Sequence, residues 1–223
     1  MSRSHALGFF LVRAKTPSEA VSHVQRMQGD GVGLLASDFP MAEPQALLRS
    51  IRNAGPGRQL RFVVVGPRPE ASVRTQLRDA GLRLALWEPF DDGALRFQLN
   101  RALYEKEQTP SEHRREVHVP TVFIARVVTQ DRQKDVIVYN LSTGGAFLET
   151  PRPSPRSSRI ELELPLPSAR IRVFAKVGFT NVPGNLERPQ LPHGMGVAFE
   201  SLAPQDLEAI RRYVEERARG LEV

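Results

Sequence analysis

The hexapeptide NLSTGG, residues 140–145, lies between two apolar runs, DVIVY at 135–139 and AFLET at 146–150. Asn, Ser, Thr and Gly are typical of tight connections between strands, because they tolerate or require unusual backbone angles. The stretch therefore predicts two strands joined by a short turn. Whether the turn also holds a ligand stays open at this point.

The sequence around this turn extends the β pattern. Two further runs alternate strictly between apolar and polar residues, with the apolar set Ile160, Leu162, Leu164, Ile171, Val173, Ala175, Val177 and Phe179. Adding the apolar runs at 121–128 and 195–200 gives about six strands with turn signals between them, typical of a small antiparallel barrel or sandwich. A closing helix is expected over 204–219, with Leu207, Ile210 and Val214 on one face.

The first half has a different sequence pattern, in which short apolar runs alternate with segments of helical periodicity. Strands are expected at 7–12, 31–36, 61–65 and 82–87. Helices are expected at 16–28, 44–55, 69–81 and 91–105. Strands and helices that alternate with short links predict an α/β fold with a parallel sheet. We therefore expect an α/β domain at 1–106, a polar linker at 107–112 and a small β-barrel domain at 113–223.

Composition limits the class of protein. The 223 residues are 40% hydrophobic and 25% charged, which is typical of a globular chain. There is no cysteine, which excludes disulfides and thiolate metal sites and fits a reducing compartment. The apolar run near the N-terminus is too short to span a membrane. We therefore expect a cytoplasmic chain without membrane insertion.

The net charge of +6 is unevenly distributed. Residues 1–106 carry 15 Lys and Arg against 10 Asp and Glu, whereas the remainder is nearly balanced. The cations are spread along the chain, no basic helix is visible, and aromatic residues are few. We therefore predict no binding to nucleic acid.

Enzymatic motifs are absent from the sequence. It contains no G-x-S-x-G, no G-x-x-x-x-G-K-[ST] and no G-x-G-x-x-G. The five histidines have no metal-ligand spacing. We therefore predict a protein that is not an enzyme, with no catalytic residue, no metal site and no cofactor.

Two features of the second half point to a known family. NLSTGG matches the motif [DN]-x-S-x-x-G at Asn140, Ser142 and Gly145, and the stretch GMGVAFESLAPQDLEAIRRYV at 194–214 has the form of a last strand and terminal helix. On these residues, the segment 113–216 resembles the PilZ domain family, a small barrel known for binding cyclic di-GMP. The family has a second motif, R-x-x-x-R, just before its first strand, and HRREVHVP (113–120) occupies that place.

The resemblance implies a cyclic di-GMP ligand and a set of binding residues. An Arg guanidinium can meet the O6 and N7 acceptors of guanine with two hydrogen bonds, or stack on its face. An Asn side chain can face a guanine edge, a Ser hydroxyl can donate to a phosphate, and Gly lets the backbone approach closely. The implied binding residues are Arg114, Arg115, His118, Asn140, Ser142 and Gly145.

The first motif is incomplete in this chain. Arg114 occupies its first position, but His118 stands where the second Arg is expected. Histidine has no planar fork of donors, and losing one bidentate contact costs about 1–3 kcal/mol, roughly 5- to 150-fold in affinity. Arg115 would point to the other side of an extended chain. We therefore expect weakened or lost binding of cyclic di-GMP.

The α/β half resembles a response-regulator receiver domain without its phosphorylation chemistry. In that comparison the acceptor aspartate becomes Ala36, the hydroxyl residue that ends the central strand becomes Gly66, and the lysine becomes Glu88. The acidic pair expected after the first strand is replaced by RAK at 13–15. Aspartyl phosphorylation needs an acceptor carboxylate, a held Mg²⁺ and a cation. We therefore expect a docking or dimerising domain.

Two hypotheses follow. The first is a non-catalytic signalling adaptor that works through protein partners of a motility or secretion machinery. The family resemblance implies control of motility, pili or exopolysaccharide. The second is a functional cyclic di-GMP receptor, whose linker arginines close on the ligand and reorient the two domains. The sequence leaves homo-oligomer formation open.

Overall fold

The computed structural model describes residues 11–38, 44–55, 59–104, 116–129 and 132–223. The chain divides into two compact units, Met1–Lys106 together with Gly220–Val223, and Glu107–Arg219. The predicted linker at 107–112 lies outside the described residues. None of the described helices is long and apolar enough to cross a membrane.

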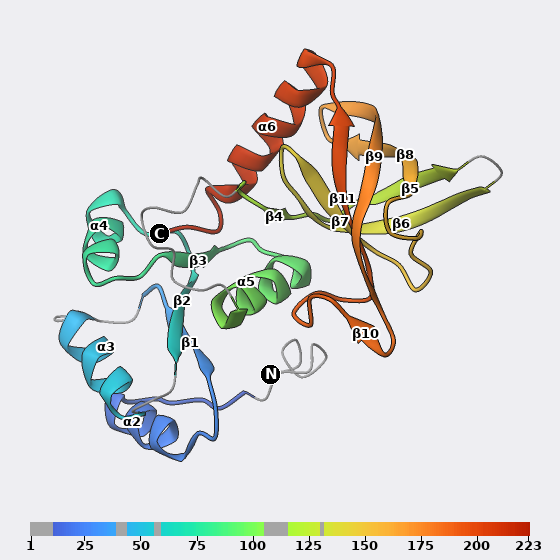
Figure 1. Cartoon of the computed structure of the whole chain (residues 1–223). Helices are drawn as coiled ribbons and strands as arrows, with labels where there is room; N and C mark the ends of the chain where they lie inside the picture. Colours follow the sequence, from blue (N-terminus) through green and yellow to red (C-terminus); the bar gives the residue numbers. More distant parts are fainter. Residues whose placement is uncertain (1–10, 39–43, 56–58, 105–115, 130–131) are drawn as a thin grey trace. The chain divides into compact units, whose positions relative to one another are not determined.

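The first unit is an α/β layer around a parallel sheet (Figure 1). Its strands, in spatial order, are β1 (Gly31–Ala36), β2 (Leu60–Gly66) and β3 (Leu84–Trp87). Its helices are α2 (Pro17–Arg26), α3 (Pro44–Asn53), α4 (Ala71–Asp79) and α5 (Asp92–Tyr104). The parallel sheet with flanking helices confirms the predicted fold class of this half.

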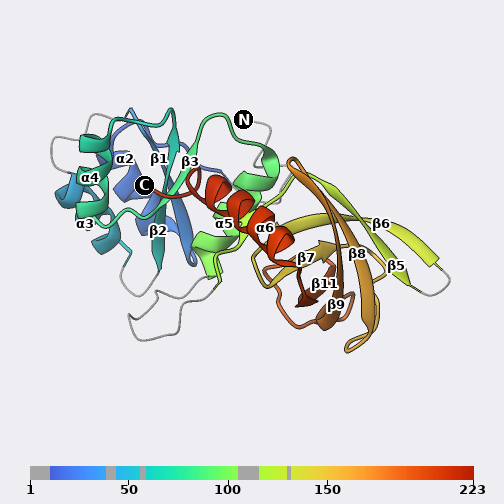
Figure 2. The ribbon, with the colours of Figure 1, turned by 90° about the horizontal axis from the view of Figure 1, so that it is seen from above.

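Helices cover both faces of this sheet. The apolar sides of α2, α3 and α4 share one core cluster with β2 and β3, and α5 packs against the strands from the other side (Figure 2). Thr16 caps α2 as its sequence predicts, because its hydroxyl accepts a hydrogen bond from the Glu19 amide at 3.2 Å. Local capping and apolar periodicity therefore explain these helices.

One expectation for this unit needs correction. The strand predicted at 7–12 is not formed at residues 11 and 12, and the rest of it lies outside the described residues. On α4, Val73 is 37% exposed, whereas Leu77 is buried. The helix is only nine residues long, so its apolar contact is confined to its C-terminal half.

The last four residues of the chain pack with the first unit. Gly220–Val223 runs antiparallel beside β3, where the Ala85 amide donates to the Leu221 carbonyl at 2.9 Å. The sequence assigned these residues to the second domain, within 113–223. A segment that follows the barrel in the chain therefore completes the edge of the α/β sheet.

The second unit is a closed antiparallel barrel with a helix. Its elements are β4 (Val119–Pro120), β5 (Ile124–Thr129), β6 (Arg132–Leu141), β7 (Gly145–Glu149), β8 (Arg159–Leu166), β9 (Ala169–Val182), β10 (Asn185–Leu186), β11 (Gly194–Ser201) and α6 (Pro204–Ala218). Six strands form the ring in the order β9-β11-β7-β6-β5-β8, and the β8–β9 pairing closes it. This confirms the predicted small barrel.

Alternation along the strands builds the barrel core. The apolar residues of β8 and most of those of β9 point inward and are buried, as predicted. Phe179 is the exception in the set predicted to point inward. The pairing of β9 with β11 shifts by one residue between Val177 and Phe179, so the ring leaves the core face. The strand expected at 121–128 begins only at Ile124.

Helix α6 covers one side of the barrel, against β4, β8 and β9. On this helix, Ile210 and Val214 are buried and Leu207 is partly buried. The Tyr213 ring meets Phe123 edge to face at 5.7 Å between centroids. The apolar stripe predicted from the sequence therefore makes the expected contact.

Candidate functional site

The loop between β6 and β7 is held by its own serine. Ser142 is fully buried, and its amide donates to the Gly145 carbonyl at 2.8 Å. The Gly145 amide donates in return to the Ser142 hydroxyl at 3.2 Å. The motif serine and glycine therefore bond to each other and fix a tight turn, which is the structural role that the sequence suggested.

Gly145 is required by a close approach between backbones. A Cβ atom at this position would overlap the carbonyl oxygen of Val197 on the neighbouring strand β11. The motif glycine therefore lets β7 and β11 lie close together. Its role in the barrel is structural, whatever the loop binds.

A carboxylate from the preceding segment occupies the mouth of the loop. The Ser142 hydroxyl donates to Glu116 Oε2 at 2.9 Å, and the Gly144 amide donates to the same oxygen at 3.1 Å. Two donors that converge on one oxygen form a small anion-binding position. In this structure the protein's own side chain fills that position.

Asn140 lies beside this position, at the end of β6. The β6–β7 pairing shifts between Val138 and Asn140, so that Asn140 stands opposite Phe147 and points away from the core face that Val138 occupies. Its other neighbour is Pro120 on β4. Asn140 is only 7% exposed.

The structure brings together part of the predicted set. His118 is exposed and immediately precedes β4, which pairs with the strand that carries Asn140. The predicted positions Arg114 and Arg115 lie outside the described residues. The sequence analysis missed Glu116, although this residue lies between the two positions of the arginine motif. The carboxylate could have indicated this contact, because the Ser142 hydroxyl and the loop amides can donate hydrogen bonds to an anion.

The three positions that the sequence analysis compared with a receiver domain lie at the carboxyl ends of the parallel strands. Ala36 ends β1, Gly66 ends β2 and Glu88 follows β3, and all three strands are parallel. The Glu88 amide donates to the Gly66 carbonyl at 2.9 Å. Neither Ala36 nor Gly66 has a side chain that accepts a phosphoryl group. Within the described ranges, no group of three or more His, Cys, Asp or Glu residues could hold a metal ion.

Comparisons with known proteins found similar solved structures. Solved structures similar to this chain include the inhibitor of motility MotI/DgrA of Bacillus subtilis, at 22% identity and a TM-score of 0.40. This match covers 51% of the present chain and 57% of MotI. The cyclic di-GMP complex of the YcgR PilZ domain from Escherichia coli matches at 17% identity and a TM-score of 0.37, over 48% of this chain and 93% of that one.

A third structure is the Borreliella burgdorferi PlzA protein in complex with cyclic di-GMP. It matches at 12% identity and a TM-score of 0.33, over 44% of this chain and 40% of PlzA. The chain therefore spans just over half the length of MotI and less than half that of PlzA. No curated protein sequence matches the chain.

The family comparison agrees with the loop and the barrel. The family model described as PilZ domain matches residues 108–216, a range that contains the NLSTGG loop, the closed barrel and most of α6. The motif residues Ser142 and Gly145 form the turn in this barrel. Residues 108–216 of the chain therefore match the PilZ domain family.

Proposed function

We propose that this chain is a non-catalytic signalling adaptor of the PilZ type, in which binding of cyclic di-GMP is weakened. The intact loop at 140–145 supports the ligand, because its hydroxyl and amide donors suit a phosphate oxygen. The histidine at position 118 supports the weakening, because imidazole lacks the paired donors that read a guanine edge. The family resemblance supports control of motility, pili or exopolysaccharide.

The observation that carries this proposal is the bond between Glu116 and the loop. A phosphate that approached Ser142 and Gly144 would meet a carboxylate that already accepts both donors. Binding then requires Glu116 to leave, and the two hydrogen bonds that it makes must be broken first. The like charge of the carboxylate also opposes the two phosphates of the ligand. Both effects lower affinity.

Replacing Glu116 by Ala is expected to raise the affinity for cyclic di-GMP. Each of the two hydrogen bonds contributes about 0.5–1 kcal/mol, so removing both should raise affinity by roughly five- to thirtyfold. Glu116→Gln removes the charge but keeps an acceptor, and a smaller increase is expected. Isothermal titration of the variants measures both.

Glu208→Ala is the matched control, because it removes an exposed carboxylate of the same unit on α6, where Glu208 pairs with Arg211 at 2.8 Å. It should change affinity by no more than about twofold. A lower affinity of Glu116→Ala than of the control would contradict the competition and would indicate that Glu116 positions the binding arm.

Replacing His118 by Arg is expected to raise affinity as well. The restored guanidinium can make a bidentate contact worth about 1–3 kcal/mol, roughly 5- to 150-fold in affinity. Arg114→Ala and Ser142→Ala are expected to lower it. Isothermal titration of the wild type and the three variants tests the assignment, and equal affinity of all four proteins would overturn it.

The same titration decides between the adaptor and the alternative, a functional receptor whose linker arginines close on the ligand and reorient the domains. The turn held by Ser142 and Gly145 favours that alternative. Wild-type binding with a Kd of about 1 μM or tighter would support the receptor. Weaker binding that His118→Arg or Glu116→Ala restores would support the adaptor.

The adaptor half of the proposal concerns the α/β unit. Ala36 and Gly66 lie at the strand ends where a phosphorylated receiver domain has an acceptor aspartate and a hydroxyl residue. Signalling by phosphoryl transfer is therefore not supported. A unit without this chemistry can still act through contacts made by its surface. We therefore assign it to contacts with protein partners.

A further inference from the structure

Two shifts of strand register move side chains from the core face of the barrel to its outer face. One lies in the β6–β7 pairing between Val138 and Asn140, and the other lies in the β11–β9 pairing between Gly196 and Val197. A shift of one residue reverses the face on which the following side chains point. Asn140 and Phe179 thereby leave the core face to which strict alternation assigns them.

The two reoriented residues stand in a single row across the outer face. Asn140 pairs with Phe147, Phe147 with Gly196, and Gly196 with Phe179. The row crosses three strand spacings, about 14 Å in all. A dinucleotide with two purine ends is long enough to reach both ends of the row, and the buried Phe147 lies between these ends. The motif residue Asn140 is at one end of the row.

Phe179 forms an aromatic surface at the other end. Its ring lies over Gly196, where a Cβ atom would overlap the ring, and it stacks on Phe147 at 5.8 Å between centroids with 29° between the planes. The guanidinium carbon of Arg188 lies 4.1 Å from the centroid of the Phe179 ring. Arg188 is exposed and Phe179 is half-buried, so this arginine caps the row toward solvent.

The segment that carries Arg188 is fixed to the barrel on one side by Asn181. This asparagine is fully buried. Its side-chain amide donates to the Arg188 carbonyl at 2.6 Å, and its side-chain oxygen accepts a hydrogen bond from the Arg188 amide at 3.0 Å. Both backbone groups of Arg188 are therefore held by one buried side chain.

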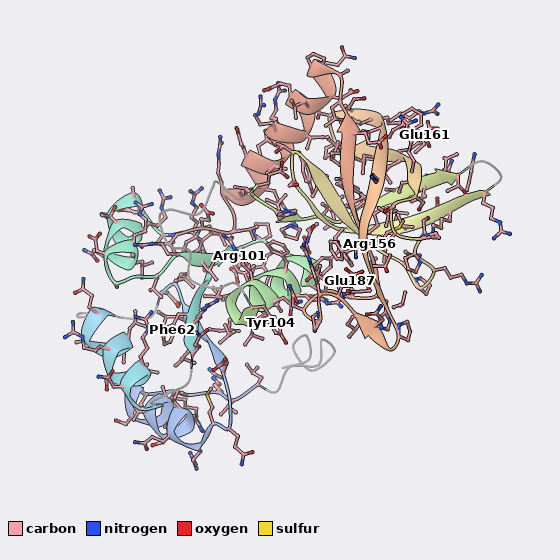
Figure 3. All side chains as sticks on the ribbon, viewed as in Figure 1. Phe62, Arg101, Tyr104, Arg156, Glu161 and Glu187 are labelled. Carbon is pink, nitrogen blue, oxygen red and sulfur yellow. The ribbon has the colours of Figure 1, made fainter. Side chains whose placement is uncertain are left out.

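Glu187 holds the same segment from a second direction. Its carboxylate pairs with Arg156 at 3.3 Å and accepts a hydrogen bond from the Thr180 amide at 3.2 Å. Figure 3 labels Arg156 and Glu187, which come from separate segments of the barrel unit. The guanidinium of Arg188 is thus positioned on the aromatic ring before any ligand arrives, which lowers the entropic cost of using it.

We propose that Arg188 and Phe179 form a second guanine-binding position, which takes the far base of a cyclic dinucleotide held at the other end by the NLSTGG loop. A planar guanidinium offers guanine either paired donors or a stacking face, and the imidazole of His118 lacks the paired donors. Arg188, which follows β10, then supplies the guanidinium that the arginine motif lacks. This inference rests on the proposed function.

Titration of cyclic di-GMP into folded full-length variants tests the position. Arg188→Ala should lower affinity by about fivefold or more, and Arg188→Lys should do nearly the same, because lysine keeps the charge and loses the planar fork. Arg170→Ala is the matched control, an exposed arginine of β9, the strand that carries Phe179, and it lies outside the row. Its effect should stay below about twofold. Thermal unfolding of each variant verifies that the barrel is intact.

The same series is measured in the His118→Arg background, so that weak wild-type binding does not hide the effect. Equal affinities of Arg188→Ala and Arg170→Ala would overturn the second guanine position. They would not contradict ligand binding at the NLSTGG loop. Full recovery by Arg188→Lys would also overturn it, because charge alone would then explain the effect. If cyclic di-GMP binds neither the wild type nor His118→Arg, the loop does not take this ligand, and the proposed receptor chemistry fails together with the inference.

Discussion

Deletion of Gly220–Val223 is expected to unfold the α/β unit. Leu221 and Val223 are both buried, and each contributes about 1.5–3 kcal/mol by leaving water. The fully buried amide of Gln98 donates to the Leu221 carbonyl at 2.6 Å, and losing that acceptor costs about 1–3 kcal/mol more. The total of about 4–9 kcal/mol is comparable with the stability of a whole domain.

Fluorescence of Trp87, the single tryptophan of the chain, is the natural readout. Its indole Nε1 donates to the Glu222 carbonyl at 2.9 Å and the ring is buried, so its emission should shift to the red when the segment is removed. Glu222→Ala is the matched control, because only the exposed side chain changes and the backbone carbonyl remains. An unchanged emission maximum and unfolding midpoint after the deletion would show that the segment is dispensable.

Replacement of Gly145 by Ala is expected to destabilise the barrel by about 3 kcal/mol. The added methyl group would overlap the Val197 carbonyl oxygen, and backbone atoms paired in a sheet cannot move aside without breaking the pairing of β7 with β11. Urea unfolding followed by far-ultraviolet circular dichroism measures the loss. Reduced ligand binding in this variant would therefore reflect the damaged strand pairing.

Gly144→Ala provides the comparison for this prediction. Its new methyl group would meet only the carboxylate end of Glu116, which is flexible and can swing away. Stability should then fall by no more than about 2 kcal/mol, because the two hydrogen bonds to Glu116 are lost but the strand pairing stays intact. Similar destabilisation by both substitutions would contradict the conclusion that Gly145 is required by the strand pairing and Gly144 is not.

Local patterns were sufficient for much of the fold. Strict alternation in β8 and β9 predicted which residues fill the barrel, and the burial of Ile160, Leu162 and Leu164 confirms it. Thr16 before a proline predicted the start of α2. These features depend on neighbours in sequence, where period and capping act over a few residues.

The candidate site was predicted only in part. The spacing of Asn140, Ser142 and Gly145 identified the loop, and the turn bonded between Ser142 and Gly145 agrees with it. The carboxylate of Glu116 in that loop was not foreseen, because it comes from 26 residues earlier in the chain. The binding roles of Arg114, Arg115 and His118 remain predictions.

By itself the sequence determined the two-part organisation, the parallel α/β layer, the barrel and the PilZ loop. Each of these follows from a period, a cap or a motif within one segment. Only the tertiary structure decided that the segment after α6 completes the α/β sheet and that Phe179 turns outward. It also decided that Arg188 lies on that ring. Register shifts and distant pairings depend on how strands meet in space, and no local pattern records which strand a residue will face.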